Sequence, residues 1–74
     1  MMGTSISKTD WINNHLYLSH KFNKELNNRG IERLSDIEKL SLLDLLSLST
    51  ITVARLRKVV RFMHANNLTF KSLG

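Results

Sequence analysis

The sequence predicts a compact, all-α single domain of four to five helices. Its 74 residues suffice for one small domain, near the lower limit at which a hydrophobic core alone offsets chain entropy. Proline is absent and glycine occurs only at positions 3, 30 and 74, so the residues that bound strands and hairpins are missing. Leucine dominates the apolar residues. We expect a flexible N-terminal tail over residues 1–8 and a helical domain over residues 9–72.

The domain should open with a short helical turn capped by Thr9 or Asp10. Four residues would share one side of this turn and lean on the core: Trp11, Ile12, His15 and Leu16. Trp11, the only tryptophan, has two interpretations. Because tryptophan is usually largely buried, a lid over one end of the core is favoured. The alternative is an anchor for a binding partner.

A longer helix should follow Ser19, whose hydroxyl suits an N-cap. Phe22 and Leu26, four residues apart, form its apolar side. Gly30 stands where a left-handed residue ends a helix. These signals predict a helix of about ten residues.

Two capping boxes then predict two short helices. Ser35 and Glu38 have the spacing of a capping box and would open a helix that reaches Leu40. Ser41 and Asp44 repeat this spacing, with aspartate in place of the usual glutamate.

The last helix should begin after one of three capping candidates, which are Ser49, Thr50 and Thr52. It should end near Ala65, where Asn66 or Asn67 takes the stop that glycine usually provides. At about 100° per residue, the buried arc consists of Leu56, Val59 and Met63. The face turned away is basic and consists of Arg57, Lys58 and Arg61, while Arg55 borders Phe62.

Val53 and Val60 flank the buried arc of this helix. A small rotation of the helix would bury both, which is the simpler interpretation. If they are exposed, an apolar pair beside cations forms a protein-interaction or self-association patch.

Positive charge is concentrated toward the C-terminus. All six acidic residues lie at or before Asp44, and five of the eleven basic residues follow it, so the net charge of +5 belongs to the last thirty residues. A basic face without acidic i±4 partners attracts phosphate or an acidic protein surface, although many such faces are merely solvated.

Several classes of function are disfavoured. The histidines at positions 15, 20 and 64 lack the spacing of metal ligands, and no cysteine is present. The serines have no G-x-S-x-G context, and one internal glycine cannot make a phosphate-binding loop. No apolar run approaches the roughly 18 to 20 residues of a membrane span. We expect a cytoplasmic, non-enzymatic protein without cofactor or metal.

A series of short motifs resembles a known family. From Leu18 to Phe70 the chain carries L-S, then G-I at 30–31, L-S-D-I at 34–37, D-L-L at 44–46 and N-L-T-F at 67–70. This pattern resembles the C-terminal domain of the bacterial RNA polymerase alpha subunit over about 53 of the 74 residues. The resemblance implies a four-helix fold that contains a helix-hairpin-helix element.

The residues that bind DNA in that family are replaced here. The family contacts the minor groove with an arginine and an asparagine on its first core helix, where this chain has Lys21 and Lys24. The glycine and serine of the family's hairpin correspond to Thr52 and Arg55, its lysine to Ala54, and a glutamate one turn later to Lys58. The resemblance therefore implies a site that has changed from base readout to charge, because lysine cannot reproduce the planar fork of arginine.

Three hypotheses follow. The first is a transcription-related module that binds nucleic acid, namely DNA, with low sequence specificity. Its binding residues would be Lys21, Lys24, Thr52, Arg55, Lys58 and Arg61. The second is a protein-interaction module that docks on RNA polymerase, a sigma factor or a transcription regulator through Trp11, Val53, Val60 and the basic helix. The third is an oligomerisation domain. We expect a monomer or a weak homodimer.

Overall fold

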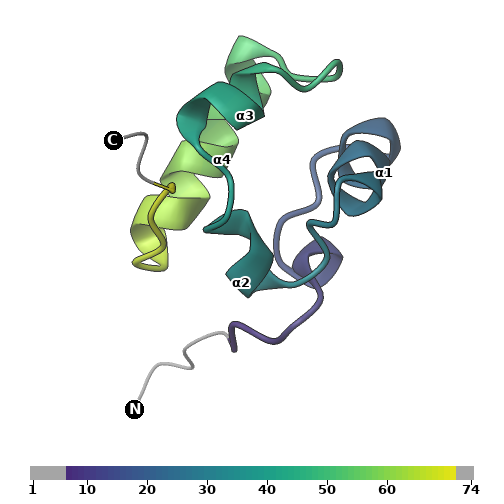
Figure 1. Cartoon of the computed structure of the whole chain (residues 1–74). Helices are drawn as coiled ribbons and strands as arrows, with labels where there is room; N and C mark the ends of the chain where they lie inside the picture. The colour runs from purple at the N-terminus through teal and green to yellow at the C-terminus, as the bar shows by residue number, and fades with distance from the viewer. Residues whose placement is uncertain (1–6, 72–74) are drawn as a thin grey trace.

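The computed structural model describes residues 7–71, whose regular secondary structure is entirely helical (Figure 1). A 3-10 turn, η1 (Ile12–Asn14), precedes four α-helices, which are α1 (His20–Asn28), α2 (Leu34–Ile37), α3 (Leu42–Leu46) and α4 (Val53–Ala65). Among these described residues no sheet is present, and a single isolated bridge pairs Trp11 with Arg33. The predicted all-α class and helix number are confirmed.

Local capping accounts for most helix boundaries. The Ser19 hydroxyl accepts from the Phe22 N–H at the start of α1, and Gly30 follows its end with φ of 86°. The Ser41 hydroxyl accepts from the Asp44 N–H, and the Asp44 carboxylate accepts from the Ser41 N–H, which confirms that capping box. Helix α4 begins after Thr52 and is followed by a left-handed residue, Asn67, with φ of 57°.

Two predicted caps are wrong. Neither Thr9 nor Asp10 caps η1, whose N-cap residue is Trp11 and makes no side-chain cap bond. Ser35, the second predicted cap, lies inside α2, which ends at Ile37 and not at Leu40. The helix begins at Leu34 because the Asp36 carboxylate accepts from the backbone N–H groups of Glu32 and Arg33, at 3.1 and 2.9 Å. These bonds lower the pKa of Asp36, with the Arg33 N–H as the largest cause.

Glu38, predicted to complete a capping box with Ser35, instead holds two other segments of the chain. Its carboxylate lies 2.9 Å from the Lys8 ammonium and accepts from the Thr69 N–H at 3.2 Å. Lys8 belongs to the predicted N-terminal tail, yet its carbonyl also accepts from the Ser35 N–H at 2.8 Å. Residues 1–6 of that predicted tail lie outside the described residues, as does residue 72 of the predicted domain.

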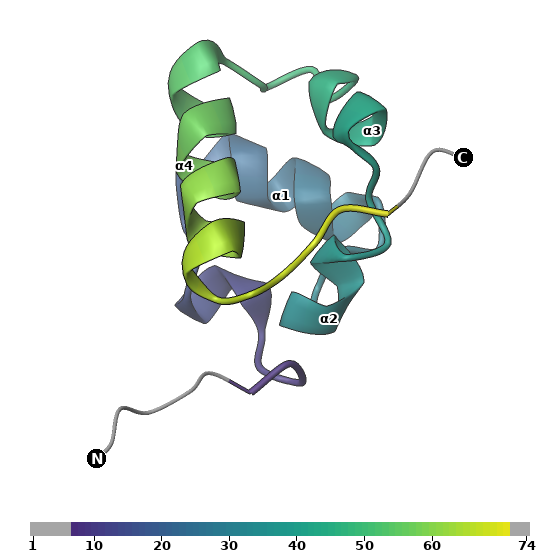
Figure 2. The ribbon, with the colours of Figure 1, turned by 90° about the vertical axis from the view of Figure 1, so that its left-hand side faces the viewer.

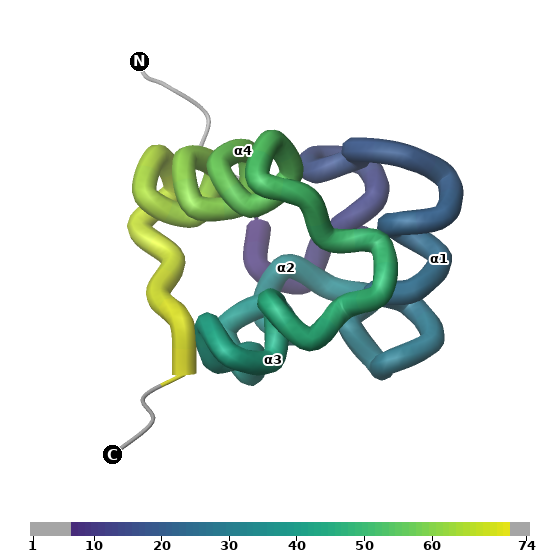
Figure 3. The backbone as a smooth tube through the Cα atoms, turned by 90° about the horizontal axis from the view of Figure 1, so that it is seen from above, coloured from purple at the N-terminus to yellow at the C-terminus, as the bar shows by residue number. Residues whose placement is uncertain are grey.

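Helices α1 and α4 lie on opposite sides of the domain, with α2 between them (Figures 1 and 3). The segment after α4 crosses back toward the α2–α3 connection, where the Lys71 N–H donates to the Leu40 carbonyl at 2.7 Å (Figure 2). Every helical element contributes to one core, which includes Ile12, Phe22, Leu26, Leu34, Ile37, Leu45, Val59 and Met63. Within residues 7–71 no helix is long and apolar enough to cross a membrane.

Candidate nucleic-acid interface

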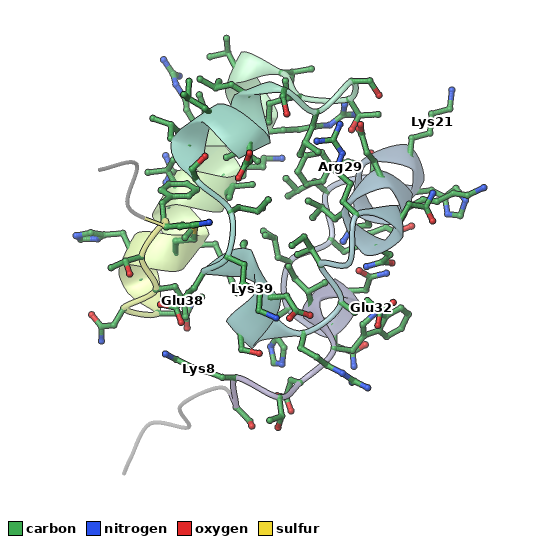
Figure 4. All side chains as sticks on the ribbon, viewed as in Figure 1. Lys8, Lys21, Arg29, Glu32, Glu38 and Lys39 are labelled. Carbon is green, nitrogen blue, oxygen red and sulfur yellow. The ribbon has the colours of Figure 1, made fainter. Side chains whose placement is uncertain are left out.

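Helix α1 presents two lysines on its exposed side. The Ser19 cap fixes the start of the helix, and the buried Phe22 fixes its rotation about the core. Lys21 and Lys24, three residues apart, are therefore exposed neighbours. Lys21 projects away from the body of the domain (Figure 4).

A carboxylate on α1 holds the connection between α3 and α4, residues 47–52, which we call the hairpin. Glu25 accepts four hydrogen bonds from this hairpin. Ser49 donates its N–H at 2.8 Å and its hydroxyl at 3.0 Å, and Thr50 donates its N–H at 3.0 Å and its hydroxyl at 2.7 Å. The Thr50 hydroxyl is the largest cause that lowers the pKa of Glu25 from 4.5 to about 2. We call this group of contacts the Glu25 clasp.

The other side of the hairpin is bound by the first turn of α4. Thr52 is the N-cap residue, and its hydroxyl accepts from the Arg55 N–H at 3.1 Å. The Arg55 guanidinium donates to the Thr50 carbonyl at 2.6 Å. Lys21 lies about one helical turn before Glu25 on α1, so the helix that carries it and the helix that carries Arg55 both bind the hairpin.

The remaining predicted cations lie further along α4. Lys58 is exposed and follows Arg55 by three residues, so it continues the same side of the helix. Arg61 is also exposed, but it lies about 120° around the axis from Arg55 and about 9 Å further along it. Arg55 contacts the hairpin directly, Lys58 continues its side of α4, and Lys21 lies one turn from Glu25 on α1; we call these three the hairpin cations, and Arg61 lies away from them. Arg29 also contacts the hairpin, through a bond from its guanidinium to the Ser47 hydroxyl at 3.2 Å, but it is paired with Glu25.

Acidic residues in the described part of the chain are mostly engaged elsewhere. The ion pairs over residues 7–71 are Lys8–Glu38, His15–Asp10, Arg29–Glu25 and Lys39–Asp36. Asp44 caps α3, and this contact with the Ser41 N–H lowers its pKa. None of these pairs includes a hairpin cation; the carboxylate bound to the hairpin, Glu25, is paired with Arg29 at 3.7 Å.

Trp11 is not a lid over the core, because 45% of its surface is exposed. Backbone pairing with residues 32–34 determines its orientation. The Ile12 N–H donates to the Glu32 carbonyl at 2.7 Å, and the Leu34 N–H donates to the Asp10 carbonyl at 3.0 Å. In an extended pair neighbouring side chains point to opposite faces, so the fully buried Ile12 leaves Trp11 outside.

The prediction that Val53 and Val60 would be buried by a rotation of α4 is also wrong. Their exposed fractions are 69% and 42%, because the buried arc centres on Val59 and Met63 and leaves both valines on its flank, about 90° around the helix axis. Three leucines of α3 are exposed as well, and we call the whole set the α3–α4 apolar patch; it consists of Leu42, Leu43, Leu46, Val53 and Val60. A shallow groove within it is lined by Leu46, Ile51, Thr52, Val53 and Leu56.

Sequence reasoning missed two parts of these surfaces. Glu25 had no local signal, because its partners lie 24 and 25 residues away in the chain. The exposed leucines of α3 did have a local signal, because a helix of the sequence L-L-D-L-L cannot bury four leucines on one face. Metal binding has no support from the described residues, which contain no group of three or more histidine and carboxylate side chains suited to it.

Compared with models of protein families, with curated proteins and with solved structures, the chain matches none of them. The assignment of function therefore depends on its own residues and their geometry.

Proposed function

We propose that this domain is a non-catalytic module with a transcription-related role. It binds nucleic acid, namely DNA, with low sequence specificity. One observation carries the proposal. The Glu25 clasp ties α1, which carries Lys21, to the hairpin that Arg55 of α4 also binds, and none of the three hairpin cations forms an ion pair over residues 7–71. The order of α3, hairpin and α4 supports a helix-hairpin-helix-like element similar to that of the RNA polymerase alpha C-terminal domain.

The chemistry of the hairpin favours phosphate contact over base readout. The first turn of α4 carries backbone N–H groups without intrahelical acceptors, which suit an anion. Thr52 has φ of −136°, an extended conformation that any residue adopts, so this backbone needs no glycine. Its side chain still fills space that a glycine would leave open to the phosphate. Lys21 and Lys58 act as flexible point charges, which bind phosphates of any sequence.

The proposal is tested by fluorescence anisotropy with a labelled DNA duplex at several salt concentrations. If the hairpin cations and Lys24 neutralise up to four phosphates, log K should fall with log salt with a slope of about −3 to −4. The triple variant Lys21→Ala, Arg55→Ala and Lys58→Ala should reduce the slope to about −1 and abolish measurable binding at physiological salt.

A second triple variant controls for net charge. Lys39→Ala, Arg57→Ala and Lys71→Ala remove the same charge from other exposed positions. This control should weaken binding only slightly, because Arg57 lies about 160° around α4 from Arg55 and the other two residues lie outside α1 and α4. Equal losses in the two triple variants would show that net charge alone drives binding, and unchanged affinity in the first would remove the proposal.

A second candidate function is docking on a protein such as RNA polymerase or a transcription regulator. It is favoured by the α3–α4 apolar patch, where Leu43 and Val53 are 61% and 69% exposed. Leu43→Ser with Val53→Ser should abolish binding to purified polymerase while duplex binding persists. Sedimentation velocity separates this candidate from self-association, in which the same double variant would convert a dimer to a monomer.

A further inference from the structure

Two half-exposed aromatic residues lie on a different surface from the α3–α4 apolar patch. Trp11 and Tyr17 are 45% and 55% exposed, and both line a hollow beside the start of α1. A second hollow borders Trp11 together with Asn27, Glu32 and Arg33. The indole of Trp11 is therefore accessible from two hollows, which burial in the core would not allow.

The floor of the first hollow is polar in composition, yet its hydrogen bonds are satisfied within the protein. Asn23 donates to the Asn13 side chain at 3.0 Å and to the Leu16 carbonyl at 2.7 Å. Asn13 donates to the Asn27 side chain at 3.1 Å, and Asn27 donates to the Ile31 carbonyl at 2.9 Å. These amides are bonded mainly to one another and to the backbone, so the hollow favours a ligand that binds through a flat face.

The wall of the hollow carries one cation, Lys24. Lys24 and His20 line it together with the aromatic rings, and Lys21 is the exposed neighbour of Lys24 on α1. No carboxylate lines this hollow. A ligand that matches both features carries a flat ring joined to a negative charge, which describes a nucleotide unit. Proline-rich peptides also pack on exposed aromatic rings, but they bring no anion to the lysines.

We propose that the hollow between Trp11 and Tyr17 accepts an unpaired nucleobase of a single-stranded nucleic acid, whose adjacent phosphates contact Lys24 and Lys21. This inference rests on the proposed nucleic-acid function and names the form of nucleic acid that the α1 side binds. Stacking on an aromatic ring tolerates every base, because each base has a π face. Most amide donors of the floor are already engaged within the protein, so the expected binding is only weakly sensitive to sequence.

Trp11 is the only tryptophan of the chain, so its intrinsic fluorescence reports on the hollow itself. The protein is titrated with an oligonucleotide of eight thymidines and with an abasic oligonucleotide of the same length and charge. The thymidine strand should quench the fluorescence and bind roughly 5- to 100-fold more tightly than the abasic strand, the range given by stacking of one base.

Variants locate the effect. Tyr17→Ala should weaken binding of the thymidine strand and leave binding of the abasic strand unaffected. Trp11→Ala, whose binding is measured by the anisotropy of labelled strands, should have the same two effects. Leu43→Ala removes an equally exposed apolar side chain from α3 and should change neither affinity. Circular dichroism of each variant establishes that it remains folded.

The outcomes separate this inference from the proposed function. Equal, salt-dependent affinities for the two strands would overturn base stacking and leave binding by charge intact. Failure of both strands and of the duplex to bind would overturn both proposals. Quenching by a proline-rich peptide, with no response to thymidine, would overturn the inference in favour of peptide docking.

Discussion

Substitution Glu25→Gln tests whether the clasp between α1 and the hairpin stabilises the domain. Glutamine retains the size of the side chain but replaces one accepting oxygen with a donating NH₂ group. That group would face the N–H and hydroxyl donors of Ser49 or Thr50, which contact Glu25 at 2.7 to 3.0 Å. The variant should therefore lose the bond from one backbone N–H, while the hydroxyl of the same residue must turn to accept from the new NH₂ group.

The pKa of Glu25 gives the magnitude. A pKa lowered from 4.5 to about 2 corresponds to at most about 3 kcal/mol, at ~1.36 kcal/mol per unit. The Glu25 side chain lies at the surface and is 16% exposed, so solvent screening reduces this free energy to about 1–2 kcal/mol. In a domain of this size such a loss lowers Tm by about 5–10 °C.

The dependence on pH has a defined sign. Because folding lowers the pKa of Glu25, its contribution is complete above about pH 5 and is lost as the pH falls toward 2. Urea denaturation of the wild type should show stability falling over this window, and Glu25→Gln should flatten that fall. Asp36, Glu38 and Asp44 also have lowered pKa values, so part of the slope remains in the variant.

Glu32→Gln provides the matched control, since Glu32 is exposed and its side chain forms no ion pair within residues 7–71. It should leave both the midpoint and its pH dependence close to those of the wild type. Identical pH profiles for the wild type and Glu25→Gln would refute the reasoning, because the clasp would then contribute nothing that depends on its charge.

Three further substitutions test the fold by urea denaturation. Asn23→Leu should cost roughly 2–4 kcal/mol, because it strands the Leu16 carbonyl and the Leu18 N–H inside the domain; a loss below about 1 kcal/mol would contradict this. Gly30→Ala should cost about 1 kcal/mol through its φ of 86° alone, since a Cβ there meets nothing within 4 Å, and Gly30→Asn should cost less. Ser41→Ala removes the cap of α3 and should cost about 1 kcal/mol, an effect absent from Ser41→Thr.

The sequence predicted the boundaries of α1, α3 and α4 because their signals are local. A cap such as Ser19 or Thr52 acts on a backbone N–H three residues away, and Gly30 or Asn67 acts through its own φ. Such interactions can be recognised from spacing alone.

Predictions failed where several acceptors or non-local partners compete. Asp36 lies three residues after an arginine and Glu38 three residues after a serine, so both have the spacing of a capping box. The packing of the N-terminal segment decides that Glu38 binds Lys8 instead. Trp11 was expected on the core because its residue type is usually buried, whereas pairing with Arg33, 22 residues away, turns it outward. The candidate site shares this limit, since the cations were identifiable from sequence but their arrangement around the hairpin depends on the Glu25 clasp.

The bridge between Trp11 and Arg33 also bears on how readily this protein can acquire new specificity. Position 11 is held by the main-chain N–H of Ile12 and the main-chain carbonyl of Asp10, groups that do not depend on which side chain stands between them. Folding therefore places little constraint on the residue type at position 11. Single substitutions there can be selected for recognition alone, in nature or in the laboratory, without compensating changes in the interior.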